Sequence, residues 1–441
     1  MKKIIKFIDL FAGLGGIRLG LEHACQQLNI KSQCVLTSEI KIDAVRTYQE
    51  NFPNSEVYGD IRTIPSEDIP DFDILLAGFP CQSFSSAGTR QGFADTRGTL
   101  FFEVERILRD KQPSEFILEN VEGLVTNDAG KTLKTILQTL QDLGYQVSWK
   151  VLNAIEFGVP QNRKRVYIVG TKDRPIFLDT FQKSKSVSLS DILETGKPTL
   201  QTKFIDNLLT RYSLDELAGK SIKDKRGGNN NIHSWDINLK GEVSETQRIF
   251  LNLFLKERRK KKWAILKGIK WMDGMPLTLD EITSFFNTDN LFESQYLKTL
   301  LDDLVEKKYL AFEHPKDEVE ILNQNNKKIK KRQPRTDLPK GYNIITGKLS
   351  FEINKILDPN GIAPTLVATD IERLAVVDGH GLRKLTIREG LRLFGFPDRY
   401  QIELPERKAF DLLGNTVVVP VIEKIVHCLY SLDNTKNLPE Q

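Results

Sequence analysis

The residues with the clearest chemical potential stand at the ends of apolar runs. Cys81 follows Pro80 directly, after the apolar stretch LLAGF and before the small polar stretch QSFSSAG. Pro80 fixes its own φ angle and stiffens this turn. A thiol at a strand end, near helix N-termini, can have a lowered pKa and act as a thiolate nucleophile. The alternatives for Cys81 are a small core residue, one half of a disulfide, or a metal ligand.

The cysteine content of the chain limits these alternatives. Cys25, Cys34, Cys81 and Cys428 show no CxxC spacing and no zinc-type cluster with histidine. A disulfide framework is not expected in a chain of 441 residues without a secretory signal. We therefore expect no metal, and Cys81 is either core filler or a catalyst.

Two further groups that can do acid–base or binding chemistry adjoin apolar strands. Glu119 follows the run EFIL. It is either a surface charge or an acid whose apolar surroundings raise its pKa, so that it donates a proton at neutral pH. Arg163 and Arg165 lie at the start of the run RVYIVG. They are either surface charges or ligands for a planar acceptor or a phosphate. The residue types alone leave both pairs of alternatives open.

A glycine-rich loop, DLFAGLGG at residues 9–16, follows the first apolar run and opens a helical pattern. Glycines let the backbone approach a bound nucleotide and leave helix N-terminal amides free. The spacing GxGG departs from GxGxxG, and the GKS/T of a phosphate-binding loop is absent. Glu39, at the end of the second strand pattern, can bind two ribose hydroxyls, and Asp60 can accept from an adenine amino group. The pattern indicates a pocket for an adenosine-type ligand, without residues that bind a phosphate. The alternative is a tight turn with two surface acids.

The elements that position these residues alternate between strand and helix. Helical spacing begins at Ile17, with Leu21 and Ala24 on the same face. Such alternation predicts a doubly wound, Rossmann-like α/β sheet, in which ligands lie at the carboxyl ends of the strands. The predicted strands are 4–11, 34–40, 71–79, 115–121, 145–154 and 165–171, and further helices are predicted at 43–52, 99–110 and 131–144.

The character of the chain changes after about residue 175. Residues 244–310 look mainly helical, and 278–312 can form a helix-turn-helix or an ordinary helical hairpin. Two basic blocks, KERRKKK at 256–262 and KKIKKR at 327–332, fit contact with a phosphate backbone, or else a solvated face and a linker. We predict a catalytic domain at 1–175, an inserted target-recognition domain at 176–400 and a returning segment at 401–441.

Composition argues against a membrane protein. Hydrophobic residues make up 40% of the chain and charged residues 28%, as in soluble globular proteins. We find no run of eighteen apolar residues. The apolar N-terminal stretch is interrupted by Lys6 and Asp9, so we interpret it as the first strand of a cytosolic domain rather than a signal peptide.

Taken together and in order, these motifs resemble the DNA cytosine-C5 methyltransferase family of the bacterial type. The similarity covers about residues 5–175 and 360–430, and the segment between corresponds to the family's variable target-recognition region. The motifs that carry the resemblance are FIDLFAGLGG, SEIKIDA, YGDI, GFPCQSFS, DTRGTLFFE, ENV, QNRKR, APTLVATD, RKLTIREGLRLFGFPD and LLGNTVVVPV.

The resemblance implies a role for each matching residue. Cys81 matches the nucleophile, Glu119 the acid at cytosine N3, and Arg165 the residue that contacts the base carbonyl, with Arg163 beside it in the same catalytic motif. Ile40 stands where many relatives carry an aromatic residue over the adenine, and Thr416 where serine is frequent. The implied cofactor is S-adenosylmethionine, held by Phe11, Ala12, Gly13, Leu14, Gly15, Gly16, Glu39, Ile40, Asp60, Ile61, Gly78, Pro80, Leu100, Asn415, Thr416 and Val417.

The implied reaction is methylation of C5 of a flipped-out cytosine in double-stranded DNA, through a covalent Cys81–C6 adduct. The family's members commonly work in restriction–modification systems, so the resemblance also implies pairing with a cognate endonuclease. We expect a monomer, because one cytosine is modified per turnover and the motifs make a complete site within one chain. We expect a cytoplasmic location, because the N-terminal stretch does not read as a signal peptide. The alternative with the same chemistry is a tRNA cytosine-5 methyltransferase. A dinucleotide-dependent oxidoreductase would explain the glycine loop alone, and a DNA-binding regulator the helix pair alone. The target sequence itself cannot be deduced, because no single-sequence code gives it.

Overall fold

The structure is a computed structural model that describes residues 4–80, 100–178, 181, 183–225, 227–228, 230–270, 274–286, 293–322, 328–346 and 351–430. Cys81 lies outside the described residues. The chain forms two compact units. The first comprises Met1–Thr195, Asp358–Glu372 and Leu385–Gln441, and the second Gly196–Leu357 and Arg373–Lys384. The two units alternate along the chain more often than the predicted ranges 1–175, 176–400 and 401–441 do. The assignment of catalysis and target recognition to those ranges stays a prediction.

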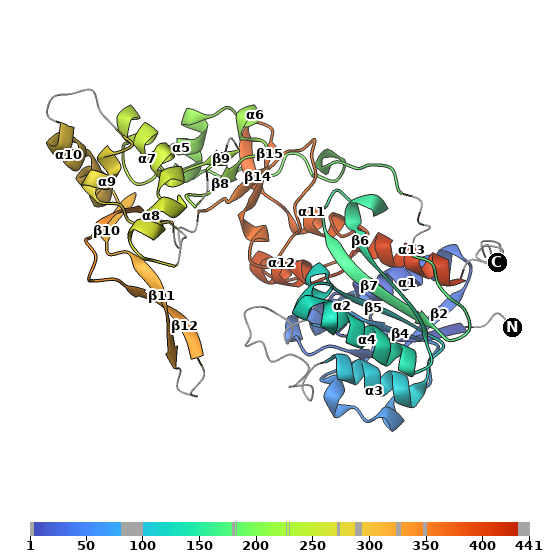
Figure 1. The fold of residues 1–441 in the computed structure, drawn as a ribbon. Coiled ribbons are helices and arrows are strands. Elements are labelled where there is room, and N and C mark those ends of the chain that lie inside the picture. Colours follow the sequence, from blue (N-terminus) through green and yellow to red (C-terminus); the bar gives the residue numbers. More distant parts are fainter. Residues whose placement is uncertain are drawn as a thin grey trace. The chain divides into compact units, whose positions relative to one another are not determined.

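The first unit is built on a seven-stranded sheet of order β3-β2-β1-β4-β5-β7-β6 (Figure 1). Strands β1 to β5 pair in parallel, whereas β7 runs antiparallel to both of its neighbours. The predicted doubly wound α/β fold is confirmed, with this one departure. The connection 154–163 between β6 and β7 is short and contains no crossover helix. Parallel neighbours need a long crossover connection, so these two strands run antiparallel. The strands are β1 (Ile4–Leu10), β2 (Lys31–Ser38), β3 (Val57–Tyr58), β4 (Ile74–Ala77), β5 (Glu115–Val121), β6 (Gln146–Asn153) and β7 (Lys164–Thr171).

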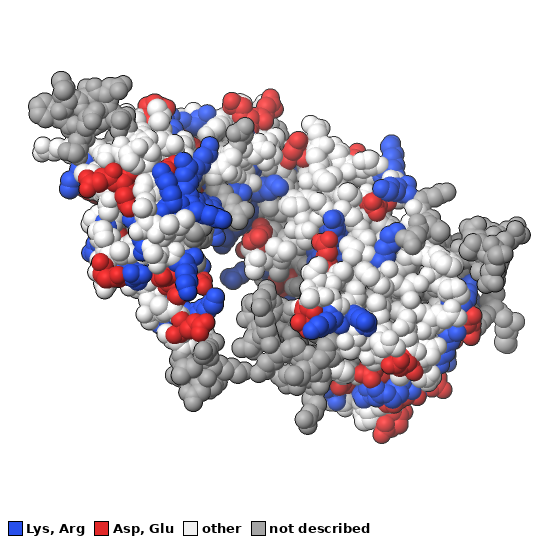
Figure 2. Space-filling view, in the orientation of Figure 1, with Lys and Arg blue, Asp and Glu red and all other residues white. Residues whose placement is uncertain are grey.

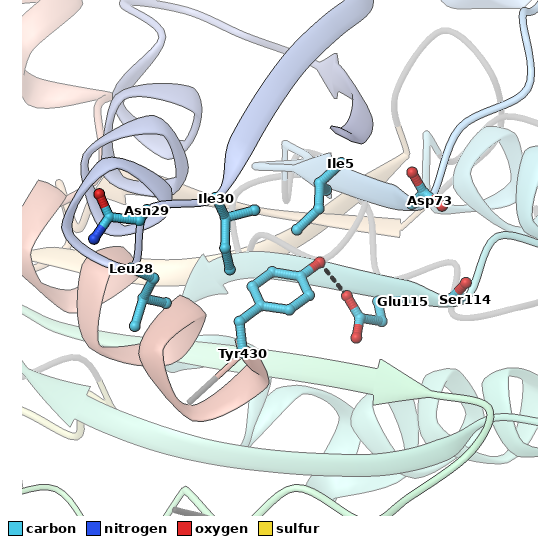
Figure 3. A pocket seen from close by; sticks show the side chains of 8 residues that line it. All are labelled: Ile5, Leu28, Asn29, Ile30, Asp73, Ser114, Glu115 and Tyr430. Carbon is cyan, nitrogen blue, oxygen red and sulfur yellow. Dashed lines mark hydrogen bonds between the residues drawn. The ribbon is translucent and has the colours of Figure 1, made fainter. Parts of the chain in front are cut away.

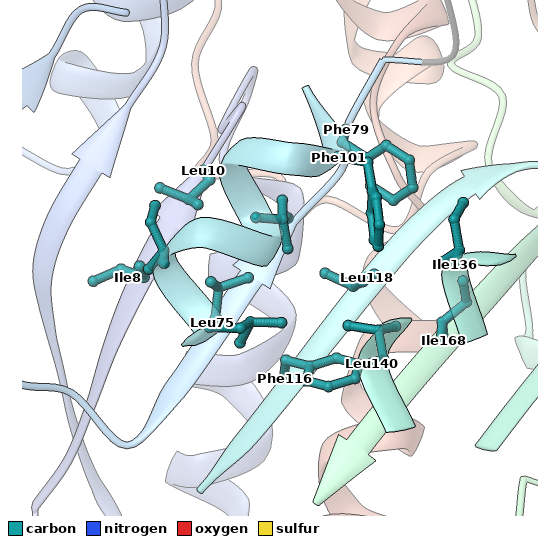
Figure 4. Close-up of a cluster of buried hydrophobic side chains, with 14 of the residues drawn as sticks. Ile8, Leu10, Leu75, Phe79, Phe101, Phe116, Leu118, Ile136, Leu140 and Ile168 are labelled. Carbon is teal, nitrogen blue, oxygen red and sulfur yellow. The ribbon is translucent and has the colours of Figure 1, made fainter. Parts of the chain in front are cut away.

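Helices cover both faces of this sheet. Helices α3 and α4 lie on one face, where their apolar residues pack against alternate side chains of β1, β4 and β5 in one core cluster (Figure 4). Helix α1 lies on the other face and packs against α13. The helices are α1 (Gly16–Gln27), α2 (Ile42–Asn51), α3 (Phe101–Lys111), α4 (Lys131–Asp142), α11 (Ile387–Arg392), α12 (Glu406–Gly414) and α13 (Val419–Tyr430).

The second unit has two cores. One surrounds a five-stranded sheet of order β16-β15-β14-β8-β9 with helix α5, and the other is mainly helical and includes α7 and α10. Its helices are α5 (Lys203–Arg211), α6 (Leu214–Leu217), α7 (Glu245–Glu257), α8 (Lys261–Leu266), α9 (Leu279–Thr283) and α10 (Glu293–Glu306). Its strands are β8 (Ser221–Ile222), β9 (Asn231–Ile232), β10 (Leu310–Glu313), β11 (Lys316–Leu322), β12 (Lys328–Pro334), β13 (Gly341–Ile344), β14 (Lys355–Leu357), β15 (Leu374–Asp378) and β16 (Gly381–Lys384).

The segment 278–312 contains the two helices α9 and α10 and leads into β10. Thr278 begins α9 with a reciprocal capping box to Glu281. Strand β10 pairs with β13, so the segment is part of the helical core rather than a free module. A contact between this segment and DNA stays a hypothesis.

One helical stretch, Glu406–Tyr430, is long and apolar enough to span a membrane by composition, and 67% of its most apolar window is buried inside the protein. Within it, α13 packs along α1 over several turns, with Ile422 against Gly20. This burial is what a core helix of a globular unit requires.

Candidate active site

The turn that leads to Cys81 is held from both sides. Phe79 is buried, and its ring lies against the ring of Phe101 on α3, with centroids 5.8 Å apart. Asn120, buried in β5, donates from Nδ2 to the carbonyl of Phe79 at 2.9 Å, and its Oδ1 accepts from the amide of Val121 at 2.8 Å. The backbone just before Cys81 is therefore bound to the carboxyl end of the neighbouring strand.

Glu119 lies at the same edge of the sheet. A Cβ built on Gly78 would be 3.7 Å from Glu119 Oε2, so the carboxylate faces the backbone of the turn. Only 9% of Glu119 is exposed, and burial raises the pKa of its carboxyl group while Arg165 and Arg163 oppose that rise. A carboxyl group in this setting can hold a proton nearer to neutral pH than an exposed one.

The partner of Glu119 comes from the antiparallel strand. Arg165 Nε lies 3.2 Å from Glu119 Oε1, and both side chains are largely buried. The register explains the contact: Glu119 is opposite Tyr167 and Val121 is opposite Arg165, which places these side chains on one face. The structure thus brings together Glu119 and Arg165, two residues predicted from sequence to act on one base.

Arg163 is placed differently. It is buried (2% exposed), and its guanidinium donates to the carbonyls of Leu366 (2.9 Å), Gly414 (3.2 Å) and Thr416 (2.8 Å). The guanidinium also lies 5.0 Å from the ring centroid of Phe394. Burial, helped by the charge of Arg165, lowers the pKa of Arg163 to about 10, so it stays charged at neutral pH. Through these contacts Arg163 holds the C-terminal segments in place, and we call this arrangement the brace. The catalytic role predicted for Arg163 stays a prediction.

The glycine loop has the geometry of a ligand-binding turn. Phe11, Gly13 and Gly15 all have positive φ angles, and Gly15 begins α1 with no side-chain cap and no acid in the first turn. The helix N-terminus therefore keeps amides free of side-chain partners. Among the residues that the structure describes, a Cβ on Gly13 would meet only the carbonyl of Phe11, at 4.0 Å, so these residues leave open space in front of the loop. The amide of Ala12 donates to the carbonyl of Ser38 and so ties the loop to the end of β2.

Glu39 is fixed at the end of β2 as the sequence predicts. Its Oε2 accepts from the amide of Gly13 at 2.9 Å, and its Oε1 accepts from the amides of Ile40 and Lys41 at 2.9 and 2.8 Å. The carboxylate retains lone pairs for ribose hydroxyls. Ile40 is 68% exposed beside it, so its side chain is accessible to a bound ligand.

Of the remaining predicted cofactor residues from the first half of the chain, Gly78 and Pro80 follow β4, with Pro80 exposed, and the others follow β3 or begin α3. Asp60 binds the guanidinium and amide of Arg62, which lowers the pKa of the carboxyl group and keeps it a charged acceptor. Ile61 is buried beside it, and Leu100 is half-buried at the start of α3. The hydroxyl of Ser38 donates to the carbonyl of Gly59 at 2.7 Å and so ties the ends of β2 and β3 together.

The last predicted segment, 415–417, reaches the glycine loop across 400 residues of sequence. A Cβ on Gly16 would lie 2.9 Å from Val417 Cγ2 and 3.1 Å from Thr416 Oγ1, so these two side chains lie close to the backbone of Gly16. Asn415 is exposed and donates to the carbonyl of Asp411 at 2.8 Å. The hydroxyl of Tyr400 donates to the carbonyl of Leu14 at 2.5 Å and closes the loop from the same side.

Sequence reasoning missed several residues that position the site. Asn120 is one, and its signal is a buried amide in an otherwise apolar strand. Asp9 is another: it is buried below the loop, accepts from the hydroxyl of Tyr48 at 3.1 Å, and has its pKa raised by burial to about 7. Arg18 completes this network by donating to Tyr48 at 3.1 Å and lying 4.0 Å from the ring centroid of Phe52. The spacing of Asp9, Arg18 and Tyr48 alone carries no such signal.

A hollow of about 490 Å³ lies at the amino ends of the strands, opposite the edge that carries Glu119 (Figure 3). Its lining residues precede β2, β4 and β5 or lie at the start of β1 and the end of α13, and Tyr430 donates to Glu115 across it. Ligands of open α/β sheets bind at the carboxyl ends of the strands. This hollow at the amino ends is therefore not the active site. It is lined by Ile5, Leu28, Asn29, Ile30, Asp73, Ser114, Glu115 and Tyr430.

Comparison with known proteins shows to which family this chain belongs. The profile of the family described as C-5 cytosine-specific DNA methylase matches residues 5–431. The chain belongs to this family. It is 56% identical over 437 residues to the Type II methyltransferase M.NlaIV of Neisseria lactamica, covering 96% of this chain and 99% of that protein. It is 55% identical over 437 residues to the Type II methyltransferase M.NgoBV of Neisseria gonorrhoeae, with the same coverage.

A solved structure agrees with this chain at the level of the fold. The S. pombe Dnmt2 methyltransferase superposes with a TM-score of 0.52 at 15% identity, covering 98% of this chain and 99% of that one. The family resemblance predicted from the motifs is confirmed by the family match over residues 5–431 and by the identity to the Type II methyltransferases.

Proposed function

We propose that the enzyme transfers the methyl group of S-adenosylmethionine to C5 of a cytosine flipped out of duplex DNA, within a specific sequence. The observation that carries this proposal is the placement of Glu119. Its buried carboxyl group faces the backbone that leads to Cys81, in a chain that matches the cytosine-specific family over residues 5–431. The Type II relatives support DNA as the substrate and a place in restriction and modification.

The glycine loop supports a cofactor with an adenosine moiety and no phosphate. Open space in front of Gly13, the fixed carboxylate of Glu39 and the exposed face of Ile40 suit an adenine ring and its ribose. When bound, S-adenosylmethionine supplies an electrophilic methyl group on a sulfonium. The residues of this chain bind and orient it, with Thr416 and Val417 closing the loop side of the pocket.

In the proposed mechanism the Cys81 thiolate adds to C6 of the cytosine, and Glu119 gives its proton to N3 as the ring electrons shift. Covalent addition divides one difficult step into two easier ones. General acid help of this kind contributes about 10²–10⁴-fold. C5 would then take the methyl group that bound S-adenosylmethionine would supply, and the electron pair of the broken sulfur–carbon bond would stay with the leaving thioether. A base removes the C5 proton, the C5–C6 double bond reforms, and Cys81 leaves as a thiolate while N3 returns its proton.

Arg165 has two tasks in this scheme. Its guanidinium, 3.2 Å from Glu119, holds the carboxyl group in place and presents further donors to the oxygen of a bound base. Its positive charge also limits how far burial can raise the pKa of Glu119. The acid therefore remains able both to give and to take back a proton.

A methyl-transfer assay tests the proposal. The purified enzyme is incubated with labelled S-adenosylmethionine and either duplex DNA or tRNA, with Cys81→Ser as the inactive control. We expect label in duplex DNA only, and bisulfite sequencing of DNA from an expressing host then identifies the target cytosine. Label confined to tRNA would overturn the proposal and favour the RNA substrate.

We further propose a monomeric enzyme in the cytoplasm, working beside a cognate endonuclease. Support for the monomer comes from motifs that form a complete site within one chain, and support for the endonuclease from the Type II names of the relatives. We assign target recognition to the second unit.

A further inference from the structure

The outward face of helix α8 carries an unusual combination of residues. Lys261 and Ile265 are four residues apart, as are Lys262 and Leu266, so the four side chains share one face of the helix. Ile265 is 74% exposed and Leu266 71% exposed. We call these four residues the α8 outer face.

The apolar pair on this face contributes little to the fold. The opposite side of α8 already provides the core contacts, because Trp263 and Ala264 are buried in the helical cluster of the second unit. Trp263 is fixed further by its indole N–H, which donates to the carbonyl of Glu257 at 3.0 Å. Two neighbouring exposed apolar side chains on a rigid helix indicate a binding surface more than a structural requirement.

Four lysines precede the apolar pair along the chain, two of them on α8 itself. Lys256, Lys260, Lys261 and Lys262 are all exposed. Lys256 and Lys261 form no ion pair with any residue that the structure describes. Lys260 and Lys262 both bind the buried carboxylate of Glu257, which orders them without reversing the net charge. Figure 2 shows Lys and Arg side chains gathered over the part of the second unit in which Figure 1 draws α7 and α8.

Not every cation of the block KERRKKK belongs to this surface. Arg258 is buried, donates to Asn343 Oδ1 at 2.7 Å, and packs against Gly274, where a Cβ would come within 2.3 Å of its guanidinium. Arg259 donates to the carbonyl of Lys225 at 3.2 Å. The structure thus separates structural cations from the outward lysines, a distinction that the charge pattern does not make.

From this geometry we infer that the α8 outer face is a DNA-docking surface of the second unit. Lys261, with Lys256 and Lys262, contacts phosphates, while Ile265 and Leu266 make apolar contacts inside the adjoining groove. Charge complementarity favours DNA over a second copy of this basic surface, since like charges repel. Apolar side chains beside phosphate-binding lysines are a known means of contacting thymine methyl groups or opening base steps. The inference rests on the proposed function and names a contact surface for it.

The experiment compares substitutions that leave the fold intact. Because both side chains are exposed, I265A/L266A should keep the melting temperature of the wild type. The matched control is Ile249→Ala on α7, an exposed apolar residue (54%) outside the α8 outer face. Affinity is measured with two labelled duplexes, one containing the target found by bisulfite sequencing and one scrambled.

We expect I265A/L266A to weaken binding of the target duplex about tenfold or more, and the scrambled duplex less, with an unchanged KM for S-adenosylmethionine. Lys261→Ala should weaken both duplexes alike and reduce the salt slope of log K by about 0.9, the loss of one phosphate contact. Ile249→Ala should bind both duplexes as the wild type does.

Normal DNA affinity in I265A/L266A would overturn the inference while leaving the proposed function intact. The same holds if this double substitution only abolishes self-association in sedimentation experiments, because the face would then join two copies of the chain. Failure of the wild type to methylate any duplex would instead overturn the proposed function itself.

Discussion

Gly16→Ala should uncouple cofactor binding from stability. An added Cβ would lie 2.9 Å from Val417 Cγ2, 3.1 Å from Thr416 Oγ1 and 3.3 Å from Phe396 Cζ. Ordinary carbon contacts begin near 3.5 Å, so the segment 416–417 must withdraw by roughly 0.6 Å. Val417 is β-branched and stiff, so a rotamer change relieves little of this overlap.

The expected magnitudes follow from these contacts. Overpacking of this kind costs about 1–3 kcal/mol, and alanine returns up to about 1 kcal/mol of helix propensity. The free energy of unfolding should therefore fall by about 0–2 kcal/mol. Binding of S-adenosylmethionine should weaken about tenfold or more, since a shift worth 1.4 kcal/mol in the pocket wall is a factor of ten in Kd.

Gly20→Ala is the matched control on the same helix. Its Cβ would lie 2.6 Å from Ile422 Cβ and 3.0 Å from the carbonyl of Val419, a tighter clash against backbone. We expect it to cost at least as much stability as Gly16→Ala but to leave Kd within about twofold of wild type, because it lies one turn further from the loop.

Calorimetric titration with S-adenosylmethionine, together with urea unfolding, separates the two effects. If both glycine substitutions weaken binding by the same factor, the loss comes from general destabilisation. The role given to the contact between Gly16 and residues 416–417 would then be refuted.

Four further predictions concern the first unit. Cys81→Ser should abolish turnover, and the wild type alone should form a denaturation-resistant adduct with DNA that contains 5-fluorocytosine, as gel electrophoresis would show. Glu119→Gln should slow single-turnover methylation about 10²–10⁴-fold with little change in DNA affinity; equal losses of rate and affinity would make Glu119 structural. Because burial raises the pKa of Glu119, its protonation stabilises the folded state at low pH, and this contribution disappears as pH rises through the folded pKa. Melting temperatures between pH 4.5 and 8 should thus fall more steeply with pH in the wild type than in Glu119→Gln. Arg163→Lys should lower the free energy of unfolding in urea by about 2 kcal/mol or more, since a lysine cannot reach three carbonyls in the arrangement that the guanidinium does; wild-type stability would contradict the role as a brace.

Much of the first unit could be predicted because its signals are local. Glycines at 13, 15 and 16 after an apolar run predict a turn from strand to helix, and Glu39 follows the next strand at the position that the structure confirms. The alternation of elements is likewise local information. The antiparallel course of β7 was not predicted, because it depends on how a ten-residue connection returns to the sheet rather than on any strand pattern.

Contacts between distant segments could not be predicted from residue types. Arg163 and Arg165 are two residues apart and look equivalent in sequence, yet one binds Glu119 and the other binds three carbonyls of the C-terminal segments. The difference arises because Arg165 lies within β7, opposite Val121 of β5, whereas Arg163 precedes the strand in the connection from β6. The basic block at 256–262 divides in the same manner, with Arg258 buried and Lys261 exposed.

The brace formed by Arg163 also bears on how the first unit accommodates a long insertion. This unit is assembled from three stretches of chain, Met1–Thr195, Asp358–Glu372 and Leu385–Gln441. A single guanidinium joins all three stretches, because Arg163 belongs to the first, Leu366 to the second and Thr416 to the third. Thr416 in turn lies against Gly16, where the glycine loop becomes α1. Loss of the Arg163 contacts should therefore disturb the glycine loop first, and not the second unit. By the same argument, the residues between the braced stretches can vary in sequence while the first unit keeps its shape.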